Sequence, residues 1–298
     1  MRISWRGENL LAQTPAKVNL SLEVLGKREN GFHDLETLMV SIRLFDSLQF
    51  SPCDTGELNL TTEVLNSPNH NIPTDENNIV IKAARLLKEV SGCQLGVKIH
   101  LIKRIPSEAG LGGGSSDAAA TLVCLNKFWD LKLPNAQLHE LAAQLGSDLN
   151  FFIDSNIAAI CTGRGEKISP VTMNSSLYMV IVKPKSGLST ASVFQQFRSD
   201  EIADRGISAR LSDALGSGNS QSISQGVMNS LEKPAIELNP EVGSTLNLIK
   251  KQSVLAAGMS GSGTSCFGIC RSWRHAQRVA ASIRAQSHLQ TWAIRAGV

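Results

Sequence analysis

One glycine-rich stretch of the chain reads Pro106-Ser-Glu-Ala-Gly-Leu-Gly-Gly-Gly-Ser-Ser-Asp117. An alanine-rich segment, residues 118–129, follows it directly and is typical of a helix. Glycine has no Cβ atom, so main-chain N–H groups can crowd around a ligand, and the start of a helix adds unpaired N–H groups and a partial positive charge. The stretch therefore predicts a cradle for an anion such as a polyphosphate.

Two common phosphate-binding loops are excluded by their patterns. A Walker A loop, GxxxxGK[ST], needs a lysine that this stretch lacks. A dinucleotide fingerprint, GxGxxG, begins correctly at Gly110-Leu-Gly112, but Ser115 stands in place of its third glycine. This mismatch also argues against a dinucleotide-dependent oxidoreductase. From the loop's own pattern, a flexible glycine turn before a helix remains an alternative.

Composition limits the class of protein. The chain has 298 residues, 42% of them hydrophobic, which suffices for one large domain or two ordinary ones. A net charge of +3 is too small to indicate nucleic-acid binding, and the chain shows no apolar run of membrane-spanning length and no apolar signal segment at its start. The six cysteines form no CxxC pair, which favours reduced thiols. We therefore expect a cytoplasmic protein whose partners are neither nucleic acids nor membranes.

Hydrophobic periodicity predicts strands and helices in the first half of the chain. In residues 17–25, apolar side chains alternate with polar ones that include Lys17 and Asn19, which predicts a strand with one buried face. Further strands are expected at residues 38–42, 46–50, 58–64 and 97–102. Helices are expected at residues 78–89 and 136–145, the second with Asn135 as its N-cap and Gly146 as its stop.

The second half continues the mixture of strands and helices. The continuous apolar run 177–182 is typical of a central strand. Helices are expected at residues 190–197, 240–251 and 273–285, and strands at 254–257, 264–269 and 290–294. This interleaving predicts an α+β class with helices layered on sheets. The pattern thins near residues 171–176, so we expect one domain at residues 1–172 and another at 173–298.

Three motifs in order carry a family resemblance. The segment PSEAGLGGGSSDAAATL resembles the second signature of the GHMP kinases, which include galactokinases, homoserine kinases and mevalonate kinases. Pro15-Ala-Lys-Val-Asn-Leu20 resembles the first signature, and Gly258-Met-Ser-Gly-Ser-Gly-Thr-Ser265 resembles the third. The resemblance implies an ATP-dependent kinase with a nucleotide-binding N-terminal domain like ribosomal protein S5 and a ferredoxin-like C-terminal domain. It also implies that the third motif lies against the nucleotide loop, although a plain hairpin turn is the alternative.

Further segments resemble one branch of this family. They are Asn30-Gly-Phe-His-Asp-Leu-Glu-Thr37, Leu145-Gly-Ser-Asp-Leu-Asn-Phe-Phe152, Gly163-Arg-Gly-Glu166, and Gly187-Leu-Ser-Thr190 with Phe194 after it. That branch phosphorylates the 2-hydroxyl of a cytidine-diphosphate-linked methylerythritol in the non-mevalonate route to isoprenoids. A monomer and a homodimer are both compatible with it. The chain departs from the branch at Asn150, where proline is usual, and at Glu108, which puts a negative charge near phosphates.

The resemblance gives catalytic roles to Lys17 and Asp148. Lys17 would lie beside the substrate hydroxyl, where its positive charge favours the developing alkoxide. Asp148 would accept the hydroxyl proton as an orienting base, and Asn19 would bond the substrate diol. On their patterns alone, Lys17 and Asn19 fit the solvent face of a strand, and Asp148 fits an N-cap.

The resemblance assigns the nucleotide mainly to the glycine-rich loop. Its main-chain N–H groups would wrap the triphosphate of ATP, helped by serine hydroxyls; the residues are Pro106, Ser107, Glu108, Ala109, Gly110, Leu111, Gly112, Gly113, Gly114, Ser115 and Ser116. Asn78 would reach adenine, or would simply cap its helix. Mg²⁺ is expected to shield the phosphates. Its protein ligands stay open, because Asp117 is a candidate by proximity alone and also fits a partner of the helix dipole.

The remaining candidate residues concern the cytidine. Phe32 would stack on the base, and His33 would bond its edge, because a neutral imidazole offers one donor and one acceptor. Phe194 stands where the family supplies a second ring, which implies an aromatic sandwich, and Thr190 belongs to the same substrate-binding segment. Two rivals remain open. They are another GHMP kinase, acting on homoserine or mevalonate, and a catalytically silent nucleotide sensor.

Overall fold

The computed structural model describes residues 1–29, 31–65, 72–198 and 206–297. The chain divides into two compact units, and neither is one continuous stretch. The first unit comprises Met1–Ala16, Leu44–Ser107 and Gly112–Ser155, and the second comprises Lys17–Arg43, Glu108–Leu111 and Asn156–Val298. Two long strands, β2 (Asn9–Lys27) and β3 (His33–Cys53), contribute to both units. The predicted domain boundary at residues 172/173 falls inside the second unit and stays a prediction.

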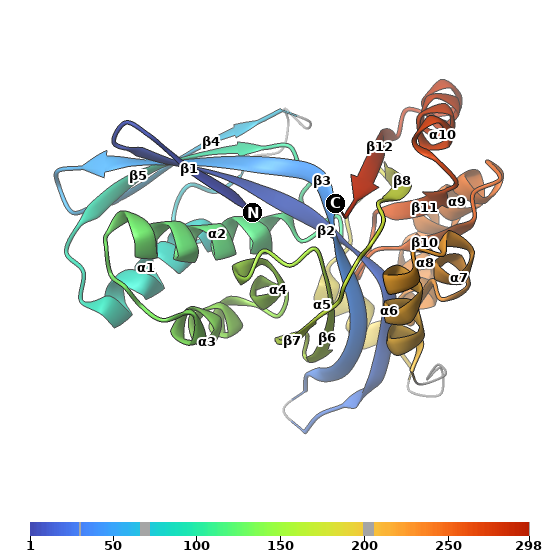
Figure 1. Ribbon diagram of the computed structural model, residues 1–298, viewed down its shortest axis with the longest axis horizontal. Helices are drawn as coiled ribbons and strands as arrows, with labels where there is room; N and C mark the ends of the chain where they lie inside the picture. Colours follow the sequence, from blue (N-terminus) through green and yellow to red (C-terminus); the bar gives the residue numbers. More distant parts are fainter. Residues whose placement is uncertain (30, 66–71, 199–205, 298) are drawn as a thin grey trace. The chain divides into compact units, whose positions relative to one another are not determined.

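The first unit combines strands with four helices. Its other elements are β1 (Arg2–Arg6), β4 (Leu58–Val64), α1 (Ile79–Ser91), β5 (Gly96–Lys103), α2 (Gly113–Phe128), α3 (Asn135–Leu145) and α4 (Leu149–Ile153). β1 pairs with β2 and β5 with β3, both antiparallel, whereas β4 runs parallel to β5. Figure 1 shows the four helices together on one side of β4 and β5. The strands predicted at residues 38–42 and 46–50 are parts of the single strand β3.

Local sequence explains the ends of α1. Asn78 is its N-cap and accepts a hydrogen bond from the Val80 N–H, and Gly92 ends the helix in the left-handed conformation at φ +67°. Its buried face includes Ala84 and Leu87, which are spaced as an amphipathic helix requires. The predicted helix at residues 78–89 is therefore confirmed.

Two other helix starts differ from the prediction. α2 begins at Gly113 rather than at residue 118, so the end of the glycine-rich stretch forms its first turn. The N-cap of α3 is Pro134 and not Asn135, because the Pro134 carbonyl already accepts from the N–H groups of Gln137 and Leu138; Asn135 is the first helical residue, and its amide donates to Oδ1 of Asp154 at 2.6 Å. The predicted stop of this helix at Gly146 is confirmed.

The second unit contains an antiparallel sheet in the order β10-β11-β8-β12-β3. Its further elements are β6 (Ala158–Gly163), β7 (Lys167–Pro170), β8 (Leu177–Lys183), α5 (Thr190–Gln196), α6 (Ile207–Ser217), α7 (Ser220–Gln225), β9 (Met228–Asn229), α8 (Glu232–Leu238), α9 (Pro240–Lys250), β10 (Ala256–Met259), β11 (Cys266–Cys270), α10 (Trp273–Gln286) and β12 (Gln290–Ala296). β8 lies between β11 and β12, as predicted for a central strand.

One apolar core holds the second unit together. α9 and α10 pack on the sheet, and their buried residues share a cluster with Val180 and Val182 on β8. Cys266 and Cys270 lie in this cluster as free thiols, and burial raises the pKa of Cys270 to about 11. Among the described helices, none is both long and apolar enough to cross a bilayer.

The strand at residues 17–25 corrects a prediction. Alternation predicted one buried face, but every residue from Lys17 to Val24 is buried, including Lys17 (3% exposed), Asn19 (2%) and Glu23 (1%). Polar side chains from other segments cover the second face: Thr37 bonds Asn19, and Ser208 bonds Ser21. A polar face inside a protein needs such partners, so the interpretation of Lys17 and Asn19 as a solvent face is wrong.

Candidate functional site

The glycine-rich loop is shared by the two units. Pro106, Ser107 and residues 112–116 belong to the first, whereas Glu108–Leu111 belongs to the second. The catalytic candidates are divided in the same way, with Asp148 in the first unit and Lys17 in the second. Their meeting at one substrate hydroxyl stays a prediction.

In the first unit, the loop forms the start of α2. Gly112 caps the helix in the left-handed conformation at φ +68°, and the Ser116 N–H closes the first turn on the Gly112 carbonyl at 2.9 Å. A Cβ atom on Gly113 would lie 2.8 Å from Cγ2 of Ile105, so a larger residue would push that side chain aside. The first turn therefore presents main-chain N–H groups from residues with little or no side chain, which is the feature that binds phosphate at helix starts.

Ser116 adds a second sign of a ligand. Its side chain is fully buried, and none of the residues that the structure describes hydrogen-bonds to its hydroxyl. Buried hydroxyls without a partner are rare and mark places where a water or a ligand completes the hydrogen bonding. The residues at this helix start thus fit the predicted phosphate group.

The Asn78 side chain is hydrogen-bonded within the first unit. The side chain is 7% exposed, its Oδ1 accepts from the Val80 N–H at 2.9 Å, and its Nδ2 donates to the Pro73 carbonyl at 2.6 Å. Both ends of the amide therefore stabilise the start of α1. Contact with adenine would require one of these bonds to be released, and that role stays a prediction.

Asp148 occupies the N-cap position of α4. Its side chain is half-buried and makes no capping hydrogen bond to any described residue of that helix. The carboxylate is therefore not used as a cap, which was the alternative to a catalytic role. Asn150 is the second residue of α4 and is 5% exposed. Proline is tolerated in the first turn of a helix, where no intrahelical N–H bond is needed, so this backbone suits either residue.

In the second unit, main-chain bonds fix the middle of the loop on two sides. The Lys17 N–H donates to the Leu111 carbonyl at 2.9 Å, and the Ser265 N–H donates to the Ala109 carbonyl at 3.1 Å. Between them, the Ser260 hydroxyl donates to the Gly110 carbonyl at 2.9 Å. The third glycine-rich motif, the turn between β10 and β11, thus lies against the loop and beside the strand that carries Lys17.

Two glycines make this close packing possible. A Cβ atom on Gly110, which has φ +70°, would lie 2.0 Å from the main-chain oxygen of Ser260. A Cβ atom on Gly261 would lie 3.3 Å from Nζ of Lys17 and 3.4 Å from Oδ1 of Asn19. The glycines therefore let three segments meet around the Lys17 ammonium.

Lys17 and Asn19 begin a buried chain of hydrogen bonds. The Lys17 ammonium donates to Oδ1 of Asn19 at 2.7 Å, and the Asn19 amide donates to the Thr37 hydroxyl at 2.8 Å. Thr37 in turn donates to the main-chain oxygen of Ser21. These bonds hold both side chains on the face that lies beside the loop, as a positioned charge requires. Thr37 and Ser260 were missed as contributors, because a lone Thr or Ser has no pattern of its own.

The cytidine candidates lie together in the second unit. The rings of His33 and Phe194 stack with centroids 5.1 Å apart at 27°, and Phe197 meets His33 edge-on at 6.3 Å. Phe32 is 51% exposed, and the Arg164 guanidinium lies 4.9 Å above its ring. Burial and then Lys27 lower the pKa of His33, which favours the neutral imidazole that reads a base edge. Phe194 stacks on His33 here, and the predicted sandwich with Phe32 stays a prediction.

Two further predicted residues have partners on neighbouring segments. Thr190 is the first residue of α5, and its hydroxyl lies 2.9 Å from that of Ser262 in the third motif. Glu108 has φ +50°, and its carboxylate would lie 2.8 Å from a Cβ atom on Gly187. Burial lowers the pKa of Lys183, and the charges of Glu108 and Glu241 partly oppose this. The Glu108 carboxylate thus lies near enough to Lys183 to act on it through charge.

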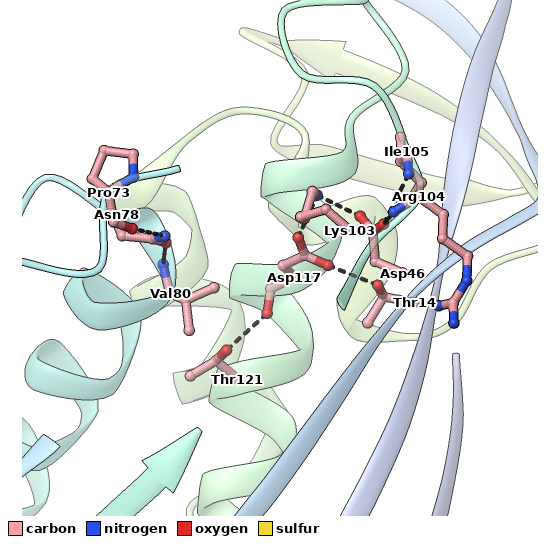
Figure 2. A network of polar contacts seen from close by, with 10 residues as sticks. All are labelled: Thr14, Asp46, Pro73, Asn78, Val80, Lys103, Arg104, Ile105, Asp117 and Thr121. Atoms are coloured by element: carbon pink, nitrogen blue, oxygen red, sulfur yellow. Dashed lines mark hydrogen bonds and ion pairs between the residues drawn. The ribbon is translucent and has the colours of Figure 1, made fainter. Parts of the chain in front are cut away.

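The first unit contains a buried ionic cluster that was not predicted from the sequence. Lys103 lies between Asp46 and Asp117 (Figure 2), and all three are at most 5% exposed. A signal existed, because Lys103 continues the buried series Val97, Ile99 and Leu101 of an alternating strand. Asp117 bonds to Lys103 and Thr14, so it is held inside the unit rather than offered to a metal. Among the described residues, no group of three or more His, Cys, Asp or Glu could hold a metal ion.

Comparisons with known proteins agree with this geometry. The family model "GHMP kinases N terminal domain" matches residues 78–164, and "GHMP kinases C terminal" matches residues 210–288. The 4-diphosphocytidyl-2-C-methyl-D-erythritol kinase of Pelotomaculum thermopropionicum is 38% identical over 275 residues, which are 92% of this chain and 94% of that protein. A crystal structure of 4-(cytidine 5'-diphospho)-2C-methyl-D-erythritol kinase matches with a TM-score of 0.80 at 32% identity, over 97% of this chain and 100% of that one. A homoserine kinase from Cytophaga hutchinsonii has a TM-score of 0.74 at 17% identity, over 100% of this chain and 97% of that one, and shows the fold alone.

Proposed function

Because the chain belongs to the family of 4-diphosphocytidyl-2-C-methyl-D-erythritol kinases, within the GHMP kinases, we propose that it transfers the γ-phosphate of ATP to the 2-hydroxyl of 4-diphosphocytidyl-2-C-methyl-D-erythritol. Family membership confirms the predicted GHMP kinase fold of the α+β class. We also infer a cytoplasmic enzyme of the non-mevalonate pathway; the free cysteines suit a reducing compartment.

One observation carries the proposal: the buried Lys17 ammonium lies where the nucleotide loop and the third motif meet. Lys17 bonds the Leu111 carbonyl through its main chain and Asn19 through its side chain. Phosphoryl transfer depends mostly on positioning and charge stabilisation, so a fixed cation beside the phosphate loop supplies what the reaction needs. Asp148 would orient the hydroxyl and accept its proton, and Asn19 would bond the diol.

The nucleotide would bind through main-chain groups. The first turn of α2, with the buried Ser116 hydroxyl, would hold phosphate oxygens, and Gly110 and Leu111 would follow the chain of phosphates. Mg²⁺ would arrive with the phosphates and neutralise part of their charge, and we assign it no protein ligand. Asn78 would approach adenine from the start of α1.

Recognition of cytidine would fall to the aromatic group. His33, stacked on Phe194, would bond the base edge as a neutral imidazole, and Phe32 would stack on the base. Thr190, tied to Ser262, would line the same pocket from α5. Homoserine and mevalonate have no base, so these aromatic residues could not stack on either of them.

A coupled ADP-release assay tests the proposal with three alcohols. We expect turnover with 4-diphosphocytidyl-2-C-methyl-D-erythritol, at least about 10³-fold above that with homoserine or mevalonate, because their lack of a base leaves the pocket's polar groups unpaired. Phosphorus NMR of the product should place the new phosphate on the 2-hydroxyl. Equal turnover of mevalonate would support another GHMP kinase. Tight ATP binding without turnover of any alcohol would support a silent nucleotide sensor.

A further inference from the structure

A buried cation joins the two ends of the nucleotide loop. Lys103 is the last residue of β5, directly before the segment that leads into the loop, and is 5% exposed. Its ammonium donates to Oδ2 of Asp117 at 2.6 Å and to Oδ2 of Asp46. Asp117 stands at the other end of the loop, in the first part of α2. Figure 2 shows Lys103 between the two carboxylates, which reach it from different elements.

Each carboxylate also holds a main-chain segment. Asp46 Oδ1 accepts from the N–H groups of Arg104 and of Ile105, the second at 2.8 Å, and these residues lead directly into Pro106. Asp117 Oδ1 accepts from the Thr14 hydroxyl of β2 at 2.8 Å. The entry to the loop and the first part of α2 are therefore tied to one ammonium group.

The helix start packs directly on this lysine. A Cβ atom on Gly113 would lie 3.2 Å from Nζ of Lys103 and 3.1 Å from Cβ of Ile105. Gly113 is the first residue of α2, and its N–H is among those that point out of the helix start. A shift of the ammonium would therefore move the N–H groups proposed to hold phosphate.

The charge of the cluster is unbalanced. Two carboxylates face one ammonium, and the titratable groups around Asp117 are Lys103 on β5 and Asp46 on β3. Burial raises the pKa of Asp117 to about 7; Lys103 opposes this, and Asp46 adds to it. The cluster thus carries a net charge near −1 above pH 7 and gains a proton below it.

We propose that Lys103, held between Asp46 and Asp117, is a positioning residue that fixes the two ends of the nucleotide loop to each other, so that nucleotide affinity depends on this bridge. The inference rests on the proposed function, because it assumes that the loop binds the phosphates of ATP. A negative charge left in the cluster opposes the polyphosphate, and a protonated cluster does not.

Three variants distinguish the effect of losing the Lys103 bridge from the effect of changing the net charge of the cluster. Asp117→Asn keeps an oxygen for Lys103 and an amide for the Thr14 hydroxyl, and makes the cluster neutral. Lys103→Met leaves two carboxylates facing each other and is expected to fold poorly. The double variant Lys103→Met/Asp117→Asn has the same net charge as the wild type but no bridge, and it leaves Asp46 with its two main-chain donors.

The first experiment measures binding of the ATP analogue AMP-PNP by calorimetry, with the melting temperature of each variant as a control for folding. At pH 8, where the wild type and the double variant have the same net charge, we expect the double variant to bind about tenfold more weakly than the wild type, and Asp117→Asn to bind at least as tightly as the wild type. The KM for the cytidylated substrate should not change. Wild-type affinity in the folded double variant would overturn the inference, because the cluster would then only stabilise the fold.

The second experiment compares the wild type with Asp117→Asn from pH 6 to pH 8. The dissociation constant of the wild type should rise by about threefold to tenfold relative to that of the variant, since only the wild-type cluster loses a proton in this range. Titration of the nucleotide itself affects both dissociation constants equally, so it does not change their ratio. A constant ratio would contradict coupling between the cluster and the nucleotide. If the wild type did not bind AMP-PNP at all, that result would contradict the proposed function itself and not the role of the Lys103 bridge alone.

Discussion

Replacing Gly110 by alanine should damage the contact between the nucleotide loop and the third motif. Gly110 has φ +70°, and an added Cβ atom would lie 2.0 Å from the Ser260 oxygen and 2.9 Å from the Gly263 oxygen. Both obstacles are main-chain atoms, so no side-chain rotation can relieve them. The substitution therefore forces the segments apart or distorts the loop.

The expected loss of stability follows from two contributions. A left-handed conformation costs an alanine about 1–2 kcal/mol. Overpacking against atoms that cannot move aside adds about 1–3 kcal/mol. The free energy of unfolding should thus fall by about 2–5 kcal/mol, and the hydrogen bond from Ser260 to the Gly110 carbonyl should weaken with it.

Chemical denaturation followed by tryptophan fluorescence measures this loss, with Gly216→Ala as the matched control. Gly216 lies inside α6, where no described residue comes within 4 Å of an added Cβ atom, so alanine should stabilise the helix by about 0.5–1 kcal/mol. If the free energy of unfolding of Gly110→Ala lay within about 1 kcal/mol of the wild-type value, the close approach described for this loop would be refuted.

Three further outcomes are expected. Asp148→Asn should lower kcat by about 10²-fold or more while the affinity for AMP-PNP stays unchanged, and near-normal turnover would remove Asp148 from the reaction. Phe32→Ala should weaken binding of the cytidylated substrate by about 1–3 kcal/mol and leave ATP binding unchanged, so equal losses in calorimetry would count against the pocket. The pKa of Asp117 is raised by burial from 3.8 to about 7, so the contribution of this carboxyl to stability is complete below about pH 4 and is lost as the pH rises through 7. Asp117→Asn lacks that loss, and its free energy of unfolding should therefore improve relative to the wild type between about pH 4 and pH 7; parallel pH profiles would show that Asp117 does not titrate there.

Local patterns predicted the elements whose ends depend on nearby residues. The helix after Asn78 begins with a side-chain cap and ends at a left-handed glycine, and both signals lie within the segment. The start of α2 was placed late, because Gly113 and Gly114 are poor helix formers and only packing of the first turn makes them helical. The prediction for Asn135 was wrong by one residue, because the helix already begins at Asn135 with Pro134 as its N-cap.

At the site, the burial of some polar side chains depends on hydrogen-bond partners that lie far away in the sequence, so the local hydrophobic pattern did not predict it. Alternation alone sends Lys17 and Asn19 to solvent, whereas folding brings Thr37 and Ser260 within hydrogen-bonding distance of Asn19 on the buried face. Lys103 is in phase with the buried side of its strand, but a lysine at a strand end usually extends into water. Its two carboxylate partners stand 57 and 14 residues away, so no local rule could pair them.

A crystal structure with AMP-PNP and the cytidylated substrate bound together tests the central claim most directly. We predict phosphate oxygens within hydrogen-bonding distance of the N–H groups of residues 112–115 and of the Ser116 hydroxyl. We also predict that Lys17 and Asp148 both reach the 2-hydroxyl in line with the terminal phosphorus. A nucleotide bound away from the start of α2, or a hydroxyl out of reach of either side chain, would contradict it.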